Sequence, residues 1–190
     1  MKIVIKEEFE MQRQDFLDRI MQGAVYIHPT DTIYGVGCNA KNSRAVNKVR
    51  AIKERTSTPF SIIAPSKDWI FENCIVSMEA EKWINKLPGP YTLIFKLKNN
   101  NAVASEVNSG AQTIGVRIPL HWIRGIAREL NVPLVTTSAN VSGKEYMVNL
   151  DTLDPEIKKR MDFVIYEGEK AGKPSTIVHL DKEEEKVIER

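Results

Sequence analysis

Two cations, Lys53 and Arg55, stand at the end of a segment with helical spacing. The apolar face before them is marked by residues three and four positions apart: Ala45, Val46, Val49 and Ile52. Two cations that leave a helix at one point can bind phosphate groups if they project into a concavity. The alternative is a solvated helix end, where the helix dipole favours basic residues.

Short polar segments follow several apolar runs that have the character of buried strands. In an open α/β sheet, groups placed after strands gather at one edge and bind ligands there. Arg117, near the end of such a run, can hold a carboxylate through two parallel hydrogen bonds. The small residues 138–143 allow backbone amides to approach a phosphate. Taken singly, each hydroxyl in these turns is equally well explained by bonds to local backbone.

The common nucleotide and metal motifs are absent. The sequence contains neither G-x-x-x-x-G-K-[ST] nor a G-x-G-x-x-G that opens a helix, so any ATP site would have to be built differently. The histidines and cysteines are scattered without ligand spacing, which predicts no metal site, redox motif or disulfide framework. They are His28, His121, His179, Cys38 and Cys74.

Length and composition favour one domain over residues 1–190, because 190 residues with 42% hydrophobic content can bury a substantial core. The net charge of +2 gives no overall basic excess, so only a local basic concavity would indicate nucleic-acid binding. Residues 1–10 alternate apolar and charged side chains, which supports neither a signal peptide nor a membrane span and predicts a cytoplasmic protein.

Hydrophobic periodicity predicts strands alternating with helices. Helices are expected between Phe9 and Met21, from Asn42 or Ser43 to Lys53, and around residues 80–87, 123–130 and 157–161. Strands are expected at the start of the chain and at residues 24–28, 60–64, 91–98, 113–118, 134–137, 163–166, 176–180 and 186–188. Residues 183–185 should form a charged hairpin turn. The sum is an α/β domain.

Five polar segments occur in an order that resembles the YrdC family. They are HPTDTIYGVG at residues 28–37, KER at 53–55, GVRIP at 115–119, TSANVSG at 137–143 and PSTIV at 174–178. The resemblance also includes the PGPYT turn at 88–92 and runs from about residue 24 to residue 190. The chain resembles the short form of the family, which has no additional C-terminal domain.

This resemblance implies a twisted, mostly mixed β-sheet flanked by helices, with a basic concave site. The implied activity is synthesis of L-threonylcarbamoyladenylate from ATP, L-threonine and bicarbonate. Lys53 and Arg55 would meet the ATP phosphates as the catalytic cations. Thr113, Asn140 and Arg190 would help to hold the nucleotide.

For L-threonine, the resemblance assigns the carboxylate to Arg117 and the remaining contacts to Thr32, Ser138 and Ser175. Threonine and bicarbonate would form a carbamate whose oxygen attacks the α-phosphorus of ATP. Cations and Mg²⁺ would neutralise the leaving pyrophosphate, so no protein nucleophile or dedicated general base is expected. The product would serve tRNA modification through tRNA or a threonylcarbamoyl transferase complex.

Two other functions stay open. The family usually continues with Pro, two variable residues, Lys, Pro and Leu after the arginine at position 55, whereas this chain has TSTPF at 56–60, and Ile63 replaces a frequent histidine. These departures leave room for a divergent YciO-like paralogue that acts on another carbamoyl-type substrate. A double-stranded RNA or tRNA binding module would instead use Lys53, Arg55, Arg117 and Lys144 on backbone phosphates.

Overall fold

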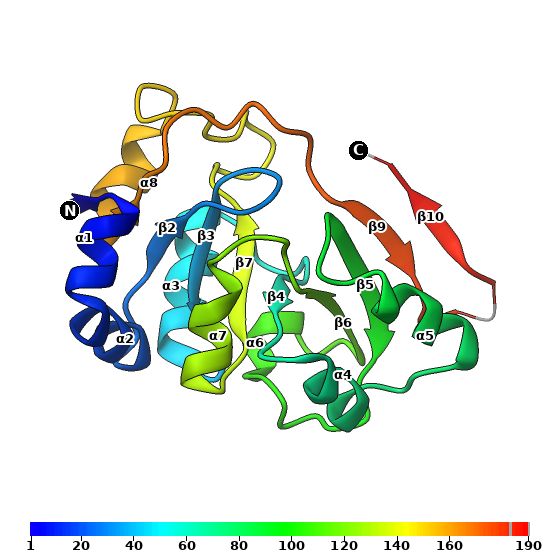
Figure 1. Cartoon of the computed structure of the whole chain (residues 1–190). Coiled ribbons are helices and arrows are strands. Elements are labelled where there is room, and N and C mark those ends of the chain that lie inside the picture. The colour runs from blue at the N-terminus through cyan, green and yellow to red at the C-terminus, as the bar shows by residue number, and fades with distance from the viewer. Residues whose placement is uncertain (183, 190) are drawn as a thin grey trace.

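The computed structural model of the chain describes residues 1–182 and 184–189. Within them one ten-stranded sheet has the order β1-β8-β2-β3-β7-β4-β6-β5-β9-β10 (Figure 1). Four neighbouring pairs are parallel and the others antiparallel, so the predicted mixed sheet is confirmed. The strands are β1 (Lys2–Val4), β2 (Tyr26–His28), β3 (Gly35–Asn39), β4 (Ser61–Ile63), β5 (Tyr91–Lys96), β6 (Thr113–Arg117), β7 (Leu134–Ser138), β8 (Phe163–Ile165), β9 (Thr176–His179) and β10 (Lys186–Ile188).

Short helices connect the strands, and several begin at side-chain caps. Asn42, Ser66 and Ser77 each accept a hydrogen bond from the amide three residues later, which satisfies a backbone donor at the helix start. The helices are α1 (Lys6–Met11), α2 (Arg13–Met21), α3 (Ser43–Lys53), α4 (Lys67–Asn73), α5 (Met78–Asn85), α6 (Ser105–Asn108), α7 (Arg124–Leu130) and α8 (Pro155–Arg160).

The two faces of the sheet bury different apolar clusters. The larger cluster joins one face to α3, α4, α5, α6 and α8. The smaller cluster joins the other face to α1, α2 and α7. Alternation along a strand separates them, because Val135 belongs to the first cluster and its neighbour Leu134 to the second.

Beyond the smaller cluster, the same face of the sheet carries small residues in place of large apolar ones. Gly35, Ser61, Thr92, Gly115 and Thr136 occupy positions that alternate with buried apolar residues on the opposite face. Side chains of this size cannot fill the space above the strands. The small residues therefore leave a hollow on this face of the sheet.

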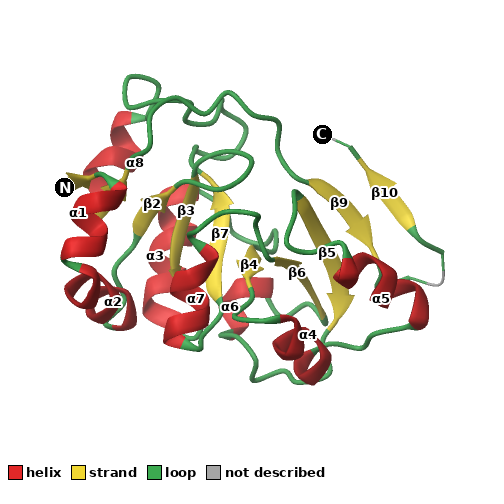
Figure 2. Ribbon diagram, in the orientation of Figure 1, coloured by secondary structure: helices red, strands yellow, loops and turns green. Residues whose placement is uncertain are grey.

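Residues 166–175, which we name the strap, connect β8 to β9 across the sheet. Figure 1 shows the strap passing over the upper edge of the strands, and Figure 2 shows that loops cover this edge. The Tyr34 hydroxyl donates to Gly168 O at 2.7 Å and accepts from Glu167 N at 2.9 Å. The Glu167 carboxylate also accepts from the Trp122 indole. These contacts fix the start of the strap against the loops beside the hollow.

Some expected elements differ in detail. The helix expected between Phe9 and Met21 is two helices that meet at Gln12, and β3, α4 and α6 were not predicted. The antiparallel pairing of β9 with β10 agrees with a hairpin, although Glu183 of the expected turn lies outside the described residues. No helix in the described ranges has the length and apolar character needed to cross a membrane.

Candidate active site

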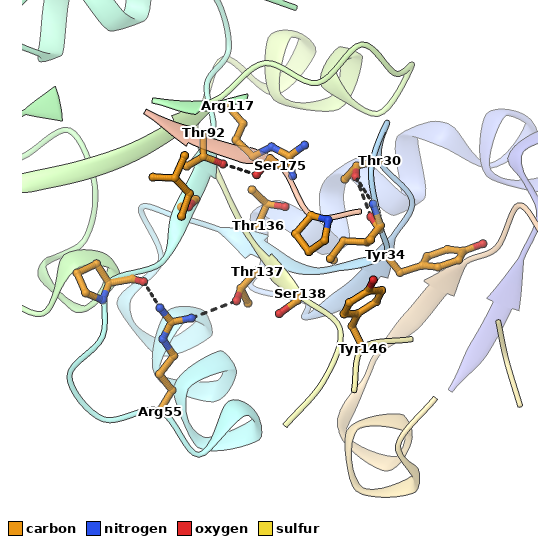
Figure 3. Close-up of a pocket in the computed structure, with 16 residues that line it drawn as sticks. Thr30, Tyr34, Arg55, Thr92, Arg117, Thr136, Thr137, Ser138, Tyr146 and Ser175 are labelled. Carbon is orange, nitrogen blue, oxygen red and sulfur yellow. Dashed lines mark hydrogen bonds between the residues drawn. The ribbon is translucent and has the colours of Figure 1, made fainter. Parts of the chain in front are cut away.

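The hollow is a cavity of about 250 Å³ that sixteen residues line (Figure 3). Arg117 and Arg55 supply its charged side chains, and no acidic residue is among the described lining residues. Hydroxyl side chains occupy most of the remaining polar lining: Thr30, Tyr34, Ser61, Thr92, Thr136, Thr137, Ser138, Tyr146 and Ser175. Such a surface suits an anionic ligand with several hydrogen-bond acceptors.

Arg117 ends β6 at one end of the cavity and is 7% exposed. Its Nη2 donates to Asp31 Oδ1 at 2.9 Å and to Thr32 Oγ1 at 3.1 Å. The second carboxylate oxygen of Asp31 accepts from Leu120 N at 2.7 Å. Asp31 therefore binds both the side chain of Arg117 and the backbone that follows it, and fixes the guanidinium in one orientation.

A chain of hydroxyls extends from this arginine. Thr30 Oγ1 donates to Ile33 O at 2.7 Å, so it accepts from the Thr32 hydroxyl, 2.9 Å away. Thr32 in turn accepts from Arg117, and all the donors in the chain point in one direction. Nearby, the hydroxyls of Ser175 and Thr92 lie 2.7 Å apart.

Lys53 does not line this cavity but lies next to Ser138, which does, and is buried beneath the turn that follows β7. Its Nζ donates to Ser138 O at 2.5 Å and to Asn140 Oδ1 at 2.6 Å. The Ser142 hydroxyl donates to Lys53 O at 2.8 Å, which holds the turn on the end of α3. Burial, followed by the positive charge of Arg55, lowers the pKa of Lys53 to about 7.

Arg55 reaches the cavity from the loop after α3. Its Nη2 donates to Pro59 O at 2.5 Å, its Nη1 lies 3.5 Å from Thr137 Oγ1, and its guanidinium lies 5.1 Å from the centre of the Phe60 ring. Burial and then the charge of Arg50 lower the pKa of Arg55.

Arg50, which the sequence did not single out, shapes this loop. Its Nη1 donates to the carbonyl oxygens of Arg55, Thr56 and Thr58 at 3.0–3.3 Å. One side chain therefore fixes the altered loop after Arg55. A basic residue on a half-buried helix face carries no sequence signal for that role.

A second, more open hollow of about 380 Å³ shares Arg55 and Ser138 with the main cavity. Lys53 and Asn140 also line it, together with the loop at residues 56–58 and the turn residues Ser142 and Gly143. The structure thus brings Lys53, Arg55, Ser138 and Asn140 together, and joins them through the main cavity to Arg117 and Ser175. Thr32 lines a neighbouring hollow and contacts Arg117.

Two predicted residues remain to be considered. Thr113 begins β6 on the same face as Arg117, roughly 13 Å away along the strand, and lines neither hollow. Arg190 lies outside the described residues. Both stay predictions.

Asp31 and Tyr146 also received no role from the sequence. Asp31 lies within the HPTDTIYGVG segment, but the sequence does not reveal its partner Arg117, which is 86 positions away. Tyr146 lines the main cavity, and its hydroxyl donates to Gly172 O of the strap at 3.2 Å. In the described part of the chain, no group of three or more His, Cys, Asp and Glu residues is arranged to hold a metal ion.

Comparison with known proteins identifies the family of the chain. A family model for Sua5, YciO and YrdC, described as telomere recombination, matches residues 18–190. A protein of Methanocaldococcus jannaschii named threonylcarbamoyl-AMP synthase is 42% identical, over 97% of this chain and 87% of its own. The chain belongs to the Sua5/YciO/YrdC family.

Solved structures of the Sua5/YciO/YrdC family share the fold. P. abyssi Sua5 in complex with L-threonine superposes with a TM-score of 0.87 at 26% identity, over 98% of this chain. The chain spans 56% of the length of that protein. E. coli YciO has a TM-score of 0.84 at 22% identity, over 100% of this chain and 94% of its own, which supports the fold alone.

Proposed function

We propose that this chain makes L-threonylcarbamoyladenylate and pyrophosphate from L-threonine, bicarbonate and ATP. The observation that carries the proposal is a single cavity with Arg117 at one end, Arg55 at the other and no described acidic side chain in its lining. Such a cavity suits two anionic substrates held side by side. The name of the M. jannaschii relative and the L-threonine bound by P. abyssi Sua5 support the same activity.

In this proposal Arg117 binds the threonine carboxylate, and Thr32, Ser138 and Ser175 supply the remaining threonine contacts. A guanidinium has five N–H donors, and Asp31 and Thr32 receive hydrogen bonds from its Nη2. Because Asp31 fixes the guanidinium, the loss of side-chain entropy on substrate binding is small.

ATP binds at the other end, where Lys53 and Arg55 neutralise its phosphates. Thr113, Asn140 and Arg190 complete the proposed nucleotide contacts. Mg²⁺ is proposed to arrive with ATP on phosphate oxygens and water, as its coordination preferences allow. When bound, it would neutralise part of the phosphate charge.

The chemistry needs two bond-forming steps. The neutral amine of threonine combines with bicarbonate to give a carbamate and water. A carbamate oxygen then attacks the α-phosphorus, and the bond to pyrophosphate breaks. The protein contributes position and positive charge, so neither a protein nucleophile nor a dedicated general base is required.

The test is to incubate the purified protein with ATP, magnesium, bicarbonate and single amino acids, and to search for acyl-adenylates by mass spectrometry. We expect threonylcarbamoyl-AMP, and near-complete loss of ATP–pyrophosphate turnover in Lys53→Ala and Arg55→Ala. An adenylate formed only with another carbamoyl-type substrate would favour the YciO-like alternative. RNA binding that persists at saturating ATP, with no adenylate formed, would favour the RNA-binding module.

The biological setting completes the proposal. We infer one domain over residues 1–190, which acts in the cytoplasm and supplies its product to tRNA through a threonylcarbamoyl transferase complex. The membership of all described strands in one sheet supports the single domain.

A further inference from the structure

Two hydroxyls on the cavity floor have no assigned role. Ser61 of β4 and Thr136 of β7 are direct partners across the two strands, and both line the main cavity. Among the described residues, neither hydroxyl has a hydrogen-bond partner, although Thr136 is only 5% exposed. Polar groups enclosed in this way are favourable only when a ligand or water satisfies them.

Glycines on the two neighbouring strands lie close to this pair. A Cβ atom on Gly115 would lie 2.8 Å from Ser61 Oγ, and one on Gly35 would lie 3.1 Å from Thr136 Oγ1. A side chain at either glycine would therefore crowd the adjacent hydroxyl, and on the Thr136 side the ring of the buried His28 already lies against Gly35. The pair lies at the bottom of a recess that is open to a small ligand.

The recess lies between the two charged ends of the cavity. Arg117 pairs with Ile63, two residues beyond Ser61, and Ser138 lies two residues beyond Thr136 in the other direction. Each two-residue step covers roughly 6–7 Å along a strand. Figure 3 shows Thr136 between Arg117 and Thr137. Thr137 in turn lies beside Arg55, with its Oγ1 3.5 Å from Nη1 of the guanidinium.

We propose that Ser61 and Thr136 form the subsite for bicarbonate, and then for the carboxylate of the carbamate. This inference rests on the proposed function, which requires a planar one-carbon acid between the amino acid and the α-phosphate. The two hydroxyls can both donate to a carboxylate, which accepts hydrogen bonds and donates none. No described acidic side chain lines the cavity to repel this anion. Hydrogen bonds to one oxygen leave the other directed toward the phosphates.

The experiment measures the KM of each substrate in Ser61→Ala and Thr136→Val. Each change removes one hydrogen bond to a charged group, so we expect the KM for bicarbonate to rise about tenfold or more. The KM values for threonine and ATP should stay within about twofold. Thr92→Val is the matched control, because its hydroxyl contacts Ser175 at the threonine end and should affect the KM for threonine instead.

Thr136→Ser separates the hydroxyl from the shape of the side chain. It keeps the donor, so it should restore the bicarbonate KM to within about threefold of the original protein, and thermal unfolding should show that all variants are folded. The inference is overturned if Thr136→Ser raises the bicarbonate KM as much as Thr136→Val, or if all three KM values rise together.

Binding of ¹³C-labelled bicarbonate, followed by its NMR line width in the presence of threonine, gives a readout that needs no turnover. Broadening that is lost in Thr136→Val supports the subsite even if no adenylate forms, in which case only the proposed function fails. An active protein whose bicarbonate broadening survives both substitutions overturns the subsite and leaves the function intact.

Discussion

Lys53 should take up a proton when ATP binds. Its pKa of about 7 in the ligand-free protein means that about one molecule in ten carries the charge at pH 8. Phosphate oxygens within contact distance raise a lysine pKa by roughly 1–3 units, to about 9–10 in the upper part of that range. At pH 8 the bound lysine is then at least about 90% charged, and uptake approaches about 0.8 proton. At pH 6 the residue is already charged, so uptake falls to about 0.1 proton.

Titration calorimetry in buffers of different ionisation enthalpy measures this uptake directly. Lys53→Met removes the group and should abolish the difference between pH 8 and pH 6. The reasoning is refuted if the original protein takes up no more protons at pH 8 than at pH 6. The pH dependence of the original protein alone decides the outcome if the variant binds ATP too weakly for titration.

The same pKa has a consequence for stability. Folding lowers the pKa of Lys53 from 10.5 to about 7, so the unfolded chain binds more protons between these two values. The free energy of unfolding should therefore rise with pH across that window, by about 1.4 kcal/mol per pH unit from this group. Urea unfolding of the original protein and Lys53→Met isolates the effect, because groups that the two proteins share cancel in the difference.

Three further substitutions test the frame of the site. Asp31→Asn removes one partner of the buried pair with Arg117, so urea unfolding should show a loss of about 3 kcal/mol and the KM for threonine should rise. Gly172→Ala would place a Cβ against the Thr32 carbonyl, and we expect a loss of about 1–3 kcal/mol with weaker threonine binding, whereas Gly125→Ala, whose Cβ would meet only the end of the Arg13 side chain at 3.8 Å, serves as the packing control. Tyr34→Phe removes two hydrogen bonds to the strap, so hydrogen exchange there should speed up; unchanged protection would contradict the anchoring role.

The sequence predicts the fold where its patterns are long. Helices α3, α5 and α7 and the strands with continuous apolar runs were expected, because their periodicity extends over several residues. Strand β3 was missed because Gly35 and Gly37 weaken its pattern. The structure shows their purpose, since a Cβ at Gly37 would lie 2.9 Å from the ring of the buried His28.

The candidate site was only partly visible in the sequence. Spacing and family resemblance indicated Lys53, Arg55, Arg117 and Asn140 and placed the cations at a concavity. They could not show that the turn after β7 buries Lys53, or that Asp31 holds Arg117, because both facts depend on contacts between residues more than 80 positions apart. The hydroxyl pair on the floor likewise requires the register of β4 against β7.

The strap delays completion of the site during synthesis. Ser175 and β9 join the sheet beside β5, whose residues are made some 80 positions earlier. A nascent chain still on the ribosome therefore displays the cationic loops before the wall that encloses them has emerged. The long sequence separation of these contacts favours late closure of this wall during folding, after the cationic loops have formed.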